Sequence, residues 1–201
     1  MKTIALAALV TVAAFCTPAH ADFSGPAAPA NWTVTTTGTL IGASPVPGTA
    51  LFSPTQLVIT GGNSISDTLG CAGATYAVLG PCDTMATLAR NGTYSFHWSY
   101  LTADDAGPAG DIFGVIINGT FMALSDPGGP ITQSGNASFA ASSSFGWFVN
   151  CTDCIGGAAT ATITNFAFAQ AVPEPSTYAL MLSGIGVLGL IGRRKRRSGR
   201  V

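Results

Sequence analysis

Short apolar runs alternate with turn residues between positions 31 and 169, and no stretch there has the 3.6-residue period of an amphipathic helix. In the clearest strand pattern, 93–101, aromatic and polar residues alternate and therefore face opposite sides. The pattern predicts about nine strands, at 31–38, 55–60, 84–90, 93–101, 111–117, 120–124, 136–142, 145–150 and 158–168. Such spacing predicts an all-β domain folded as a two-sheet sandwich or jelly roll.

One face of the strand expected at 93–101 carries four aromatic residues, Tyr94, Phe96, Trp98 and Tyr100. We interpret them as a core face; the alternative is an exposed platform on which sugar rings stack. His97 points to the other face and is the only histidine between 22 and 171. Because no Gly-x-Ser-x-Gly motif accompanies it, we interpret His97 as a structural or surface residue.

Two Asn-Gly pairs, Asn91-Gly92 and Asn118-Gly119, separate strand-like runs. Asn-Gly readily adopts the positive φ angles of a two-residue hairpin turn. Both pairs are therefore predicted to be hairpin tips.

The N-terminus has the pattern of a secretory signal peptide: a charged start, an apolar stretch and a small-x-small motif at 19–21. Signal peptidase is expected to cleave between Ala21 and Asp22 and so remove a signal helix at 1–21. The alternative is an uncleaved N-terminal anchor. Cleavage leaves an ectodomain at 22–171, a length that suits one domain with a sizeable core.

The C-terminal segment has three parts in a fixed order. They are the triplet Pro173, Glu174 and Pro175, an uncharged apolar span at 178–192, and the basic tail Arg193, Arg194, Lys195, Arg196 and Arg197. The span is near the lower length limit for a transmembrane helix. Because cytoplasmic flanks carry an excess of Lys and Arg, the expected orientation is N-terminus out and C-terminus in. An ordinary C-terminal membrane anchor is the alternative.

This order, at 172–197, resembles the PEP-CTERM sorting signal of Gram-negative bacteria that make extracellular polymeric material. The three parts together are specific, whereas Pro-Glu-Pro alone would not be. The resemblance implies that exosortase, a membrane protease-transpeptidase, removes the signal from a precursor held in the inner membrane. The mature protein is then expected at the cell surface or outside the cell. Sorting signals of this kind are also called ice-binding protein C-terminal domains, a name that does not indicate ice binding.

A weaker resemblance covers residues 93–168. The segment 96–114, followed by Asn118-Gly119 and by 133–135, is similar to a pattern in the β-sandwich ectodomains of other PEP-CTERM proteins. It implies a CUB-like or jelly-roll sandwich and brings no assigned activity.

Removal of both ends changes the charge of the protein. The whole chain carries −1, but between 22 and 171 Arg90 stands alone against eight aspartates, which gives −7. A nucleic-acid partner is therefore not expected, because phosphate binding depends on Lys and Arg. The acidic surface permits divalent cations and also suits a soluble secreted domain.

Four cysteines remain after signal cleavage, Cys71, Cys82, Cys151 and Cys154. In an oxidising compartment an even number predicts two disulfides. Three pairings exist, and the local Gly-rich loops favour Cys71–Cys82 with Cys151–Cys154. The alternatives are a zinc site or a thioredoxin-like pair, for which one CxxC motif without a nearby histidine gives little support.

An acidic loop follows the strand at 93–101 and holds Asp104, Asp105 and Asp111. Calcium takes six to eight oxygen ligands, so these three carboxylates would need carbonyls, water or further side chains to complete a site. The alternative is a solvated acidic turn. No other cofactor is expected.

Two functions follow. The first is a noncatalytic surface or matrix protein that associates with exopolysaccharide in a biofilm, and this is our prediction. The alternative is a secreted enzyme that acts on polysaccharide through two aspartates facing one cleft. The candidates for such a pair are Asp104, Asp105, Asp111, Asp126 and Asp153.

Overall fold

The structure is a computed structural model that describes residues 22–38, 40, 45–64, 71, 82–152, 154–171 and 179–188. The chain separates into two compact units, and the larger, Pro18–Ala171, holds every strand of the described residues. The strands are β1 Trp32–Thr36, β2 Thr49–Phe52, β3 Gln56–Thr60, β4 Cys82–Leu88, β5 Gly92–Leu101, β6 Asp111–Ile117, β7 Thr120–Ala123, β8 Thr132–Ala141, β9 Phe145–Cys151 and β10 Thr160–Gln170. Three 3-10 turns complete the domain, η1 Gly25–Ala27, η2 Pro29–Asn31 and η3 Gly107–Ala109.

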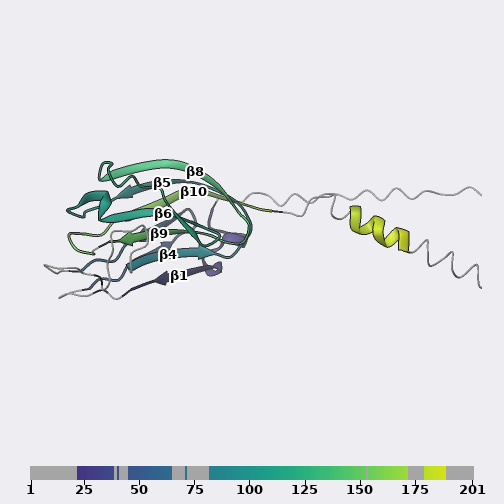
Figure 1. The fold of residues 1–201 in the computed structure, drawn as a ribbon, viewed down its shortest axis with the longest axis horizontal. Helices are drawn as coiled ribbons and strands as arrows, with labels where there is room; N and C mark the ends of the chain where they lie inside the picture. Colours follow the sequence, from purple (N-terminus) through teal and green to yellow (C-terminus); the bar gives the residue numbers. More distant parts are fainter. Residues whose placement is uncertain are drawn as a thin grey trace, which may run out of the picture. The chain divides into compact units, whose positions relative to one another are not determined.

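The strands form two antiparallel five-stranded sheets, so the predicted all-β sandwich is confirmed. One, here the β4 sheet, has the order β1-β4-β9-β6-β7; the other, the β5 sheet, has the order β2-β3-β10-β5-β8. Figure 1 shows β8, β5 and β10 in one layer and β9, β4 and β1 in the other. Strands β3 to β10 follow the orders 3-10-5-8 and 4-9-6-7, the strand order of a jelly roll, with β1 and β2 added at the edges.

All nine expected strands are present, and the tenth, β2, was not predicted. Its four residues follow the turn-like segment 45–48, and its only described partner strand is β3. A four-residue edge strand turns at most two side chains toward the core, so its alternation of apolar and polar residues is too short to detect in the sequence.

The core between the sheets is aromatic. Trp147 of β9 is fully buried, and its ring centroid lies 5.0 Å from those of Trp32 and Phe145, 5.2 Å from Phe96 and 5.4 Å from Phe166. These rings come from both sheets, so their contacts hold the two layers together. Aromatic pairs at such spacing add to the stability that comes from burial alone.

Phe23 belongs to this core although it precedes the first strand. Its ring stacks on Phe166 at 4.7 Å and meets Phe52 edge-on at 5.3 Å, and only 3% of the residue is exposed. Its backbone N–H donates to the carbonyl of Pro54 at 3.1 Å. Phe23, the second residue after the expected cleavage site, therefore packs the N-terminal segment against the β5 sheet.

The two Asn-Gly pairs have different structures. Asn118 and Gly119 have φ of 52° and 82° and join the paired strands β6 and β7, so this hairpin is confirmed. The hairpin predicted at Asn91-Gly92 is wrong, because the strands on either side, β4 and β5, lie in different sheets. Gly92 instead begins β5, where a side chain would lie 2.5 Å from the carbonyl oxygen of Ala169.

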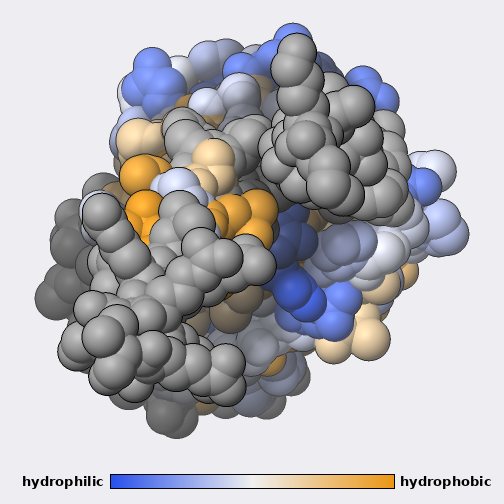
Figure 2. Space-filling model, turned by 90° about the vertical axis from the view of Figure 1, so that its right-hand side faces the viewer, coloured by the Kyte–Doolittle hydropathy of each residue, from blue (hydrophilic) through white to orange (hydrophobic). Residues whose placement is uncertain are grey.

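The outer faces of the two sheets differ. Outward-facing residues of the β4 sheet include an apolar cluster of Ile112, Ile116 and Phe148, with Met85, Phe121 and Ala123 packed against it. The outward-facing residues of the β5 sheet are mostly polar, as the next subsection describes. Figure 2 views the molecule from the right-hand side of Figure 1 and not onto either sheet, and most of the coloured surface in that view is hydrophilic.

The smaller unit is described only at 179–188, a helix whose large apolar side chains are exposed. Among the described residues no helix is both long and apolar enough to cross a membrane. The other residues of the span expected at 178–192, and the signal helix expected at 1–21, lie outside the described residues.

Candidate functional site

Most side chains on the outer face of the β5 sheet are small and polar, although Leu51 of β2 and Leu101 of β5 are also exposed there. Because alternate residues of a strand face opposite sides, the neighbours of the buried core residues form this surface, which we call the hydroxyl face. Its hydroxyl residues are Thr49, Thr60, Thr93, Ser95, Ser99, Thr132, Ser134, Ser138, Thr160, Thr162 and Thr164. Gln56, His97 and Asn136 lie among them, and these strands place no Asp, Glu, Lys or Arg on the face.

Strand register aligns these side chains in rows. One row contains Thr164 of β10, His97 of β5 and Asn136 of β8, which pair directly. In a second row, Thr60 and Thr160 face one another across β3 and β10, with their hydroxyl oxygens 3.2 Å apart. Regular spacing across strands gives a flat array of donors and acceptors, which matches the chemistry of sugar hydroxyls.

A shallow groove of about 430 Å³ lies in this face. It forms where β10 bulges between Thr164 and Ala167, with Asn165 exposed at a φ of 50°. The extra residue of a bulge bends its strand and redirects nearby side chains. The residues that line the groove are Ser95, Phe96, His97, Asn136, Ala137, Ser138 and Asn165.

His97 and Asn136 contact each other across the groove, with His97 Nδ1 3.1 Å from Asn136 Oδ1. When Nδ1 carries the proton and donates to that oxygen, Nε2 is left as an acceptor and the amide nitrogen of Asn136 as a donor. The pair can therefore offer one acceptor and one donor to a hydroxyl-bearing ligand.

The aromatic stripe of β5 does not contribute a binding platform. Tyr94, Phe96, Trp98 and Tyr100 are between 0% and 7% exposed and belong to the core cluster, as the sequence interpretation expected. His97 lies on the opposite side of the same strand, on the hydroxyl face.

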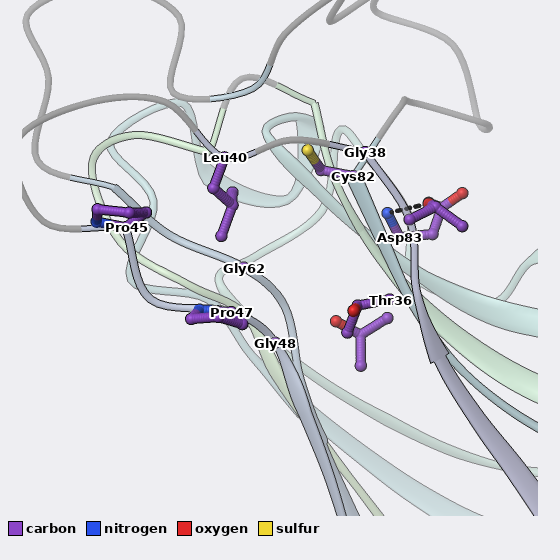
Figure 3. A pocket seen from close by; sticks show the side chains of 11 residues that line it. Thr36, Gly38, Leu40, Pro45, Pro47, Gly48, Gly62, Cys82 and Asp83 are labelled. Carbon is purple, nitrogen blue, oxygen red and sulfur yellow. Dashed lines mark hydrogen bonds between the residues drawn. The ribbon is translucent and has the colours of Figure 1, made fainter.

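A second hollow, which we call the edge pocket, has a volume of about 320 Å³ and opens beside β1 and β4 (Figure 3). Pro45, Pro47 and Gly48 lie on one side of it, with Thr36, Gly38 and Asp83 on the other. Leu40, Gly62 and Cys82 also line it. No sequence pattern predicted this pocket, because its lining comes from segments far apart in the chain.

Asp83 beside the edge pocket is 6% exposed and accepts a hydrogen bond from the Asn150 amide at 2.7 Å. Its backbone N–H donates to the Thr37 hydroxyl at 2.9 Å. Burial raises the pKa of Asp83 from 3.8 to about 6, and the hydrogen bond from Asn150 offsets part of that rise. The Asp83 carboxyl therefore releases its proton at a higher pH in the folded state than in the unfolded state.

We expect Asp83→Asn to stabilise the domain above pH 6 by on the order of 1–2 kcal/mol, because the unfolded state no longer gains from releasing this proton. In the natural protein the cost of ionising Asp83 begins as pH rises above 3.8 and is complete once pH passes about 6. Thermal unfolding of both proteins from pH 4 to pH 8 checks this. Parallel pH profiles would contradict it.

The acidic loop places two of its three aspartates in a buried setting. Asp111 is fully buried and accepts from the Thr102 hydroxyl at 3.0 Å, and Asp104 is 7% exposed with its carboxylate against Gly110. Burial raises the pKa of Tyr100, as do the charges of Asp111 and Asp104, so both carboxylates lie near this ring. Asp105 is exposed, with its side chain against Gly156.

The four cysteines form two disulfides, Cys71–Cys82 and Cys151–Cys154, the pairing that the local loops favour. Sequence did not indicate that the two bridges would meet in one buried cluster, which Leu40 covers in part. Their meeting depends on the register of β4 and β9, which pairs Cys82 with Cys151.

The sorting signal lies outside the described residues, both at Pro173, Glu174 and Pro175 and at 193–197. Ala21 of the expected signal-peptide cleavage site also lies outside them. Comparison with protein families identifies this segment: residues 171–197 match the PEP-CTERM protein-sorting motif. The chain is therefore an exported protein with a C-terminal sorting signal, and this motif implies processing by exosortase. No curated protein matches the sequence significantly.

Solved structures give distant matches. The N-terminal cellulose-binding domain of β-1,4-glucanase C from Cellulomonas fimi is 15% identical, with 73% of this chain and 92% of that chain covered and a TM-score of 0.30. A family 29 carbohydrate-binding module from Piromyces equi is 8% identical, with 70% and 91% covered and a TM-score of 0.28. TM-scores near 0.3 are too low to transfer a ligand or a function.

Proposed function

We propose that this is an exported surface or extracellular-matrix protein that binds exopolysaccharide through its hydroxyl face and catalyses no reaction. The observation that carries the proposal is the face itself: rows of hydroxyl and amide groups, free of acidic and cationic chains, with a groove at His97 and Asn136. The sorting motif supplies the location, since it sends the domain to where such polymers are found.

The charge pattern favours a neutral polymer. With −7 on residues 22–171, an anionic polysaccharide would be repelled at long range. The strands of the hydroxyl face place no charged side chains on it, so the desolvation cost of bringing a neutral sugar to this face is small. Hydrogen bonds between sugar hydroxyls and the hydroxyl and amide groups of the face replace the hydrogen bonds to water. Weak contacts repeated along a polymer can then add to useful retention.

The enzyme alternative has less support. Neither the groove nor the edge pocket is lined by Asp104, Asp105, Asp111 or Asp126, and the fifth candidate, Asp153, lies outside the described residues. Glycoside hydrolysis needs two carboxyl groups about 5–9 Å apart across an open cleft. Of these candidates, Asp104 and Asp111 are buried, which suits a structural role better than contact with a polymer.

The route that we propose for the precursor is signal-peptidase cleavage after Ala21, an inner-membrane intermediate held by 178–192 with its basic tail inside, and exosortase cleavage near Pro173. The domain limits 1–21, 22–171 and 172–197 are part of this proposal. The match to the sorting motif supports the last limit. The buried Phe23 supports the first, because cleavage at Asp22 keeps it in the mature chain.

The double variant His97→Ala with Asn136→Ala is expected to weaken binding to the producer's polysaccharide roughly tenfold or more, because two side chains lose their hydrogen bonds to the sugar. A pull-down titration with the exported protein measures this. Thr33→Ala with Thr35→Ala is the matched control, since both residues are exposed on β1 of the other sheet. Equal affinity of the two double variants would contradict the proposed surface.

Calcium binding by Asp104, Asp105 and Asp111 stays a prediction. Its support is that Asp104 and Asp111 are buried in one loop, where the Thr102 hydroxyl donates to the Asp111 carboxylate and accepts from the Asp104 backbone N–H. Two carboxylates and a hydroxyl fit the hard oxygen chemistry of calcium but leave most of its ligands to carbonyls and water. Millimolar calcium should release or absorb heat in calorimetry and raise Tm, and Asp111→Asn should abolish both effects. No heat and no thermal shift would exclude the site.

A further inference from the structure

We propose that Cys82 is a thiol–disulfide exchange site, at which a low-molecular-weight thiol enters through the edge pocket and starts a rearrangement that involves all four cysteines. The class of ligand is a small thiol that forms a mixed disulfide with Cys82. The product is a different pairing of the same four cysteines, in which Cys71 is bonded to Cys154 and Cys82 to Cys151.

The two bridges lie close enough to exchange. The sulfurs of Cys71, Cys82 and Cys154 are all within 4.8 Å of one another, although they come from three separate parts of the chain. The fourth sulfur, that of Cys151, is bonded to Cys154 and lies 3.4 Å from the carbonyl oxygen of Cys82. Exchange needs one sulfur to reach another, and the sulfurs of Cys71 and Cys154, which belong to different bridges, lie within that 4.8 Å.

Access distinguishes Cys82 from the other three cysteines. It lines the edge pocket and is 4% exposed, whereas Cys71, Cys151 and Cys154 are fully buried. In Figure 3 the Cys82 side chain lies between Leu40 and Gly38 at the rim of the hollow. Leu40 both lines the pocket and packs on the cysteine cluster, so this side chain limits the approach to the sulfur.

The first step breaks the bridge that faces the pocket. The incoming thiolate attacks the Cys82 sulfur, forms a mixed disulfide there, and the electron pair of the broken bond leaves on Cys71 as a thiolate. The Cys71 thiolate then attacks the Cys154 sulfur within 4.8 Å. This forms Cys71–Cys154 and releases Cys151 as a thiolate.

The last step returns the small thiol. Cys151 pairs directly with Cys82 across β4 and β9, and antiparallel partners have Cα atoms about 4.5–5.5 Å apart, within the range that a disulfide spans. The Cys151 thiolate attacks the Cys82 sulfur of the mixed disulfide, forms Cys82–Cys151 and expels the small thiolate. Two protein disulfides exist before and after, so no oxidant or reductant is consumed.

The test is incubation of the folded exported protein with reduced glutathione at mildly alkaline pH, followed by acid quenching, thiol blocking and non-reducing peptide mapping. We expect glutathione on Cys82 and then Cys71–Cys154 and Cys82–Cys151 linked peptides. The third pairing, Cys71–Cys151 with Cys82–Cys154, should appear only in a denatured sample. Persistence of the original pairs alone, or first attachment of glutathione to Cys151 or Cys154, would overturn the proposal.

A pair of variants tests the route. Leu40→Ala removes the side chain that covers the cluster and is expected to speed glutathione attachment to Cys82 several-fold. Val46→Ala is the control, since Val46 is 60% exposed beside the pocket residues Pro45 and Pro47 without lining the pocket. Equal rates for both variants would show that the edge pocket is not the entrance. The wild-type peptide map decides the proposal even if Leu40→Ala does not fold.

Discussion

Phe23→Ala is expected to destabilise the exported domain by about 3–5 kcal/mol, the usual cost of removing a buried phenylalanine ring. The ring stacks on Phe166 and touches Trp32, Phe52 and Trp147, so its loss opens a cavity between the sheets. For a domain of this length Tm should fall by roughly 10 °C. Thermal and denaturant unfolding of protein recovered from producing cells measures the change.

The matched control for this prediction is Leu51→Ala. Leu51 is 66% exposed on β2, and exposed apolar residues away from special features change stability by about 0.5 kcal/mol or less. If Phe23→Ala also cost less than about 1 kcal/mol, the ring would not be part of the core. A chain that begins after Phe23 should show the same loss as Phe23→Ala, which links the site of signal cleavage to stability.

Replacement of Pro173, Glu174 and Pro175 by alanine is expected to leave most of the chain as a full-length precursor in the membrane fraction. Proline fixes its own φ and disfavours a helical conformation of the preceding residue. Alanine favours a helix that continues into the apolar span. Immunoblots of membrane and released fractions, with intact mass spectrometry of each product, measure the outcome.

Two controls separate the signal from its surroundings. Gln170→Ala lies just outside the matched residues 171–197 and should be processed normally, as should Arg200→Gln at the other end. Neutralising 193–197 should instead disturb the proposed membrane orientation, in which these cations keep the C-terminus on the cytoplasmic side. Normal processing of the triple-alanine variant would show that the matched motif is not the signal in this protein.

Local sequence predicted the strands well because most bury one face completely. In β5 aromatic and polar residues alternate over the eight residues 93–100, a pattern that a helix cannot reproduce. The turn at Asn118-Gly119 was predictable for the same reason: its conformation depends on two residues alone. At Asn91-Gly92 the same residues join strands of different sheets, because tertiary packing decides which strands pair.

The candidate sites were less predictable, since each depends on register between distant segments. The His97–Asn136 contact requires β5 and β8 to pair over ten residues, and the groove beside it requires the bulge at Asn165. The cysteine cluster requires Cys82 and Cys151 to meet across β4 and β9. None of these relations leaves a local pattern, whereas the sorting signal is a continuous segment and could be identified from sequence.

The exported domain is proposed to bind polysaccharide without cleaving it. The most direct measurement is incubation of the exported protein with the producer's own polysaccharide, with protein retention and new reducing ends measured in the same sample. We predict saturable retention, weakened in the double variant His97→Ala with Asn136→Ala, and reducing ends that stay at the level of a protein-free sample. Reducing ends that rise with protein concentration, or no retention of the natural protein, would contradict the account.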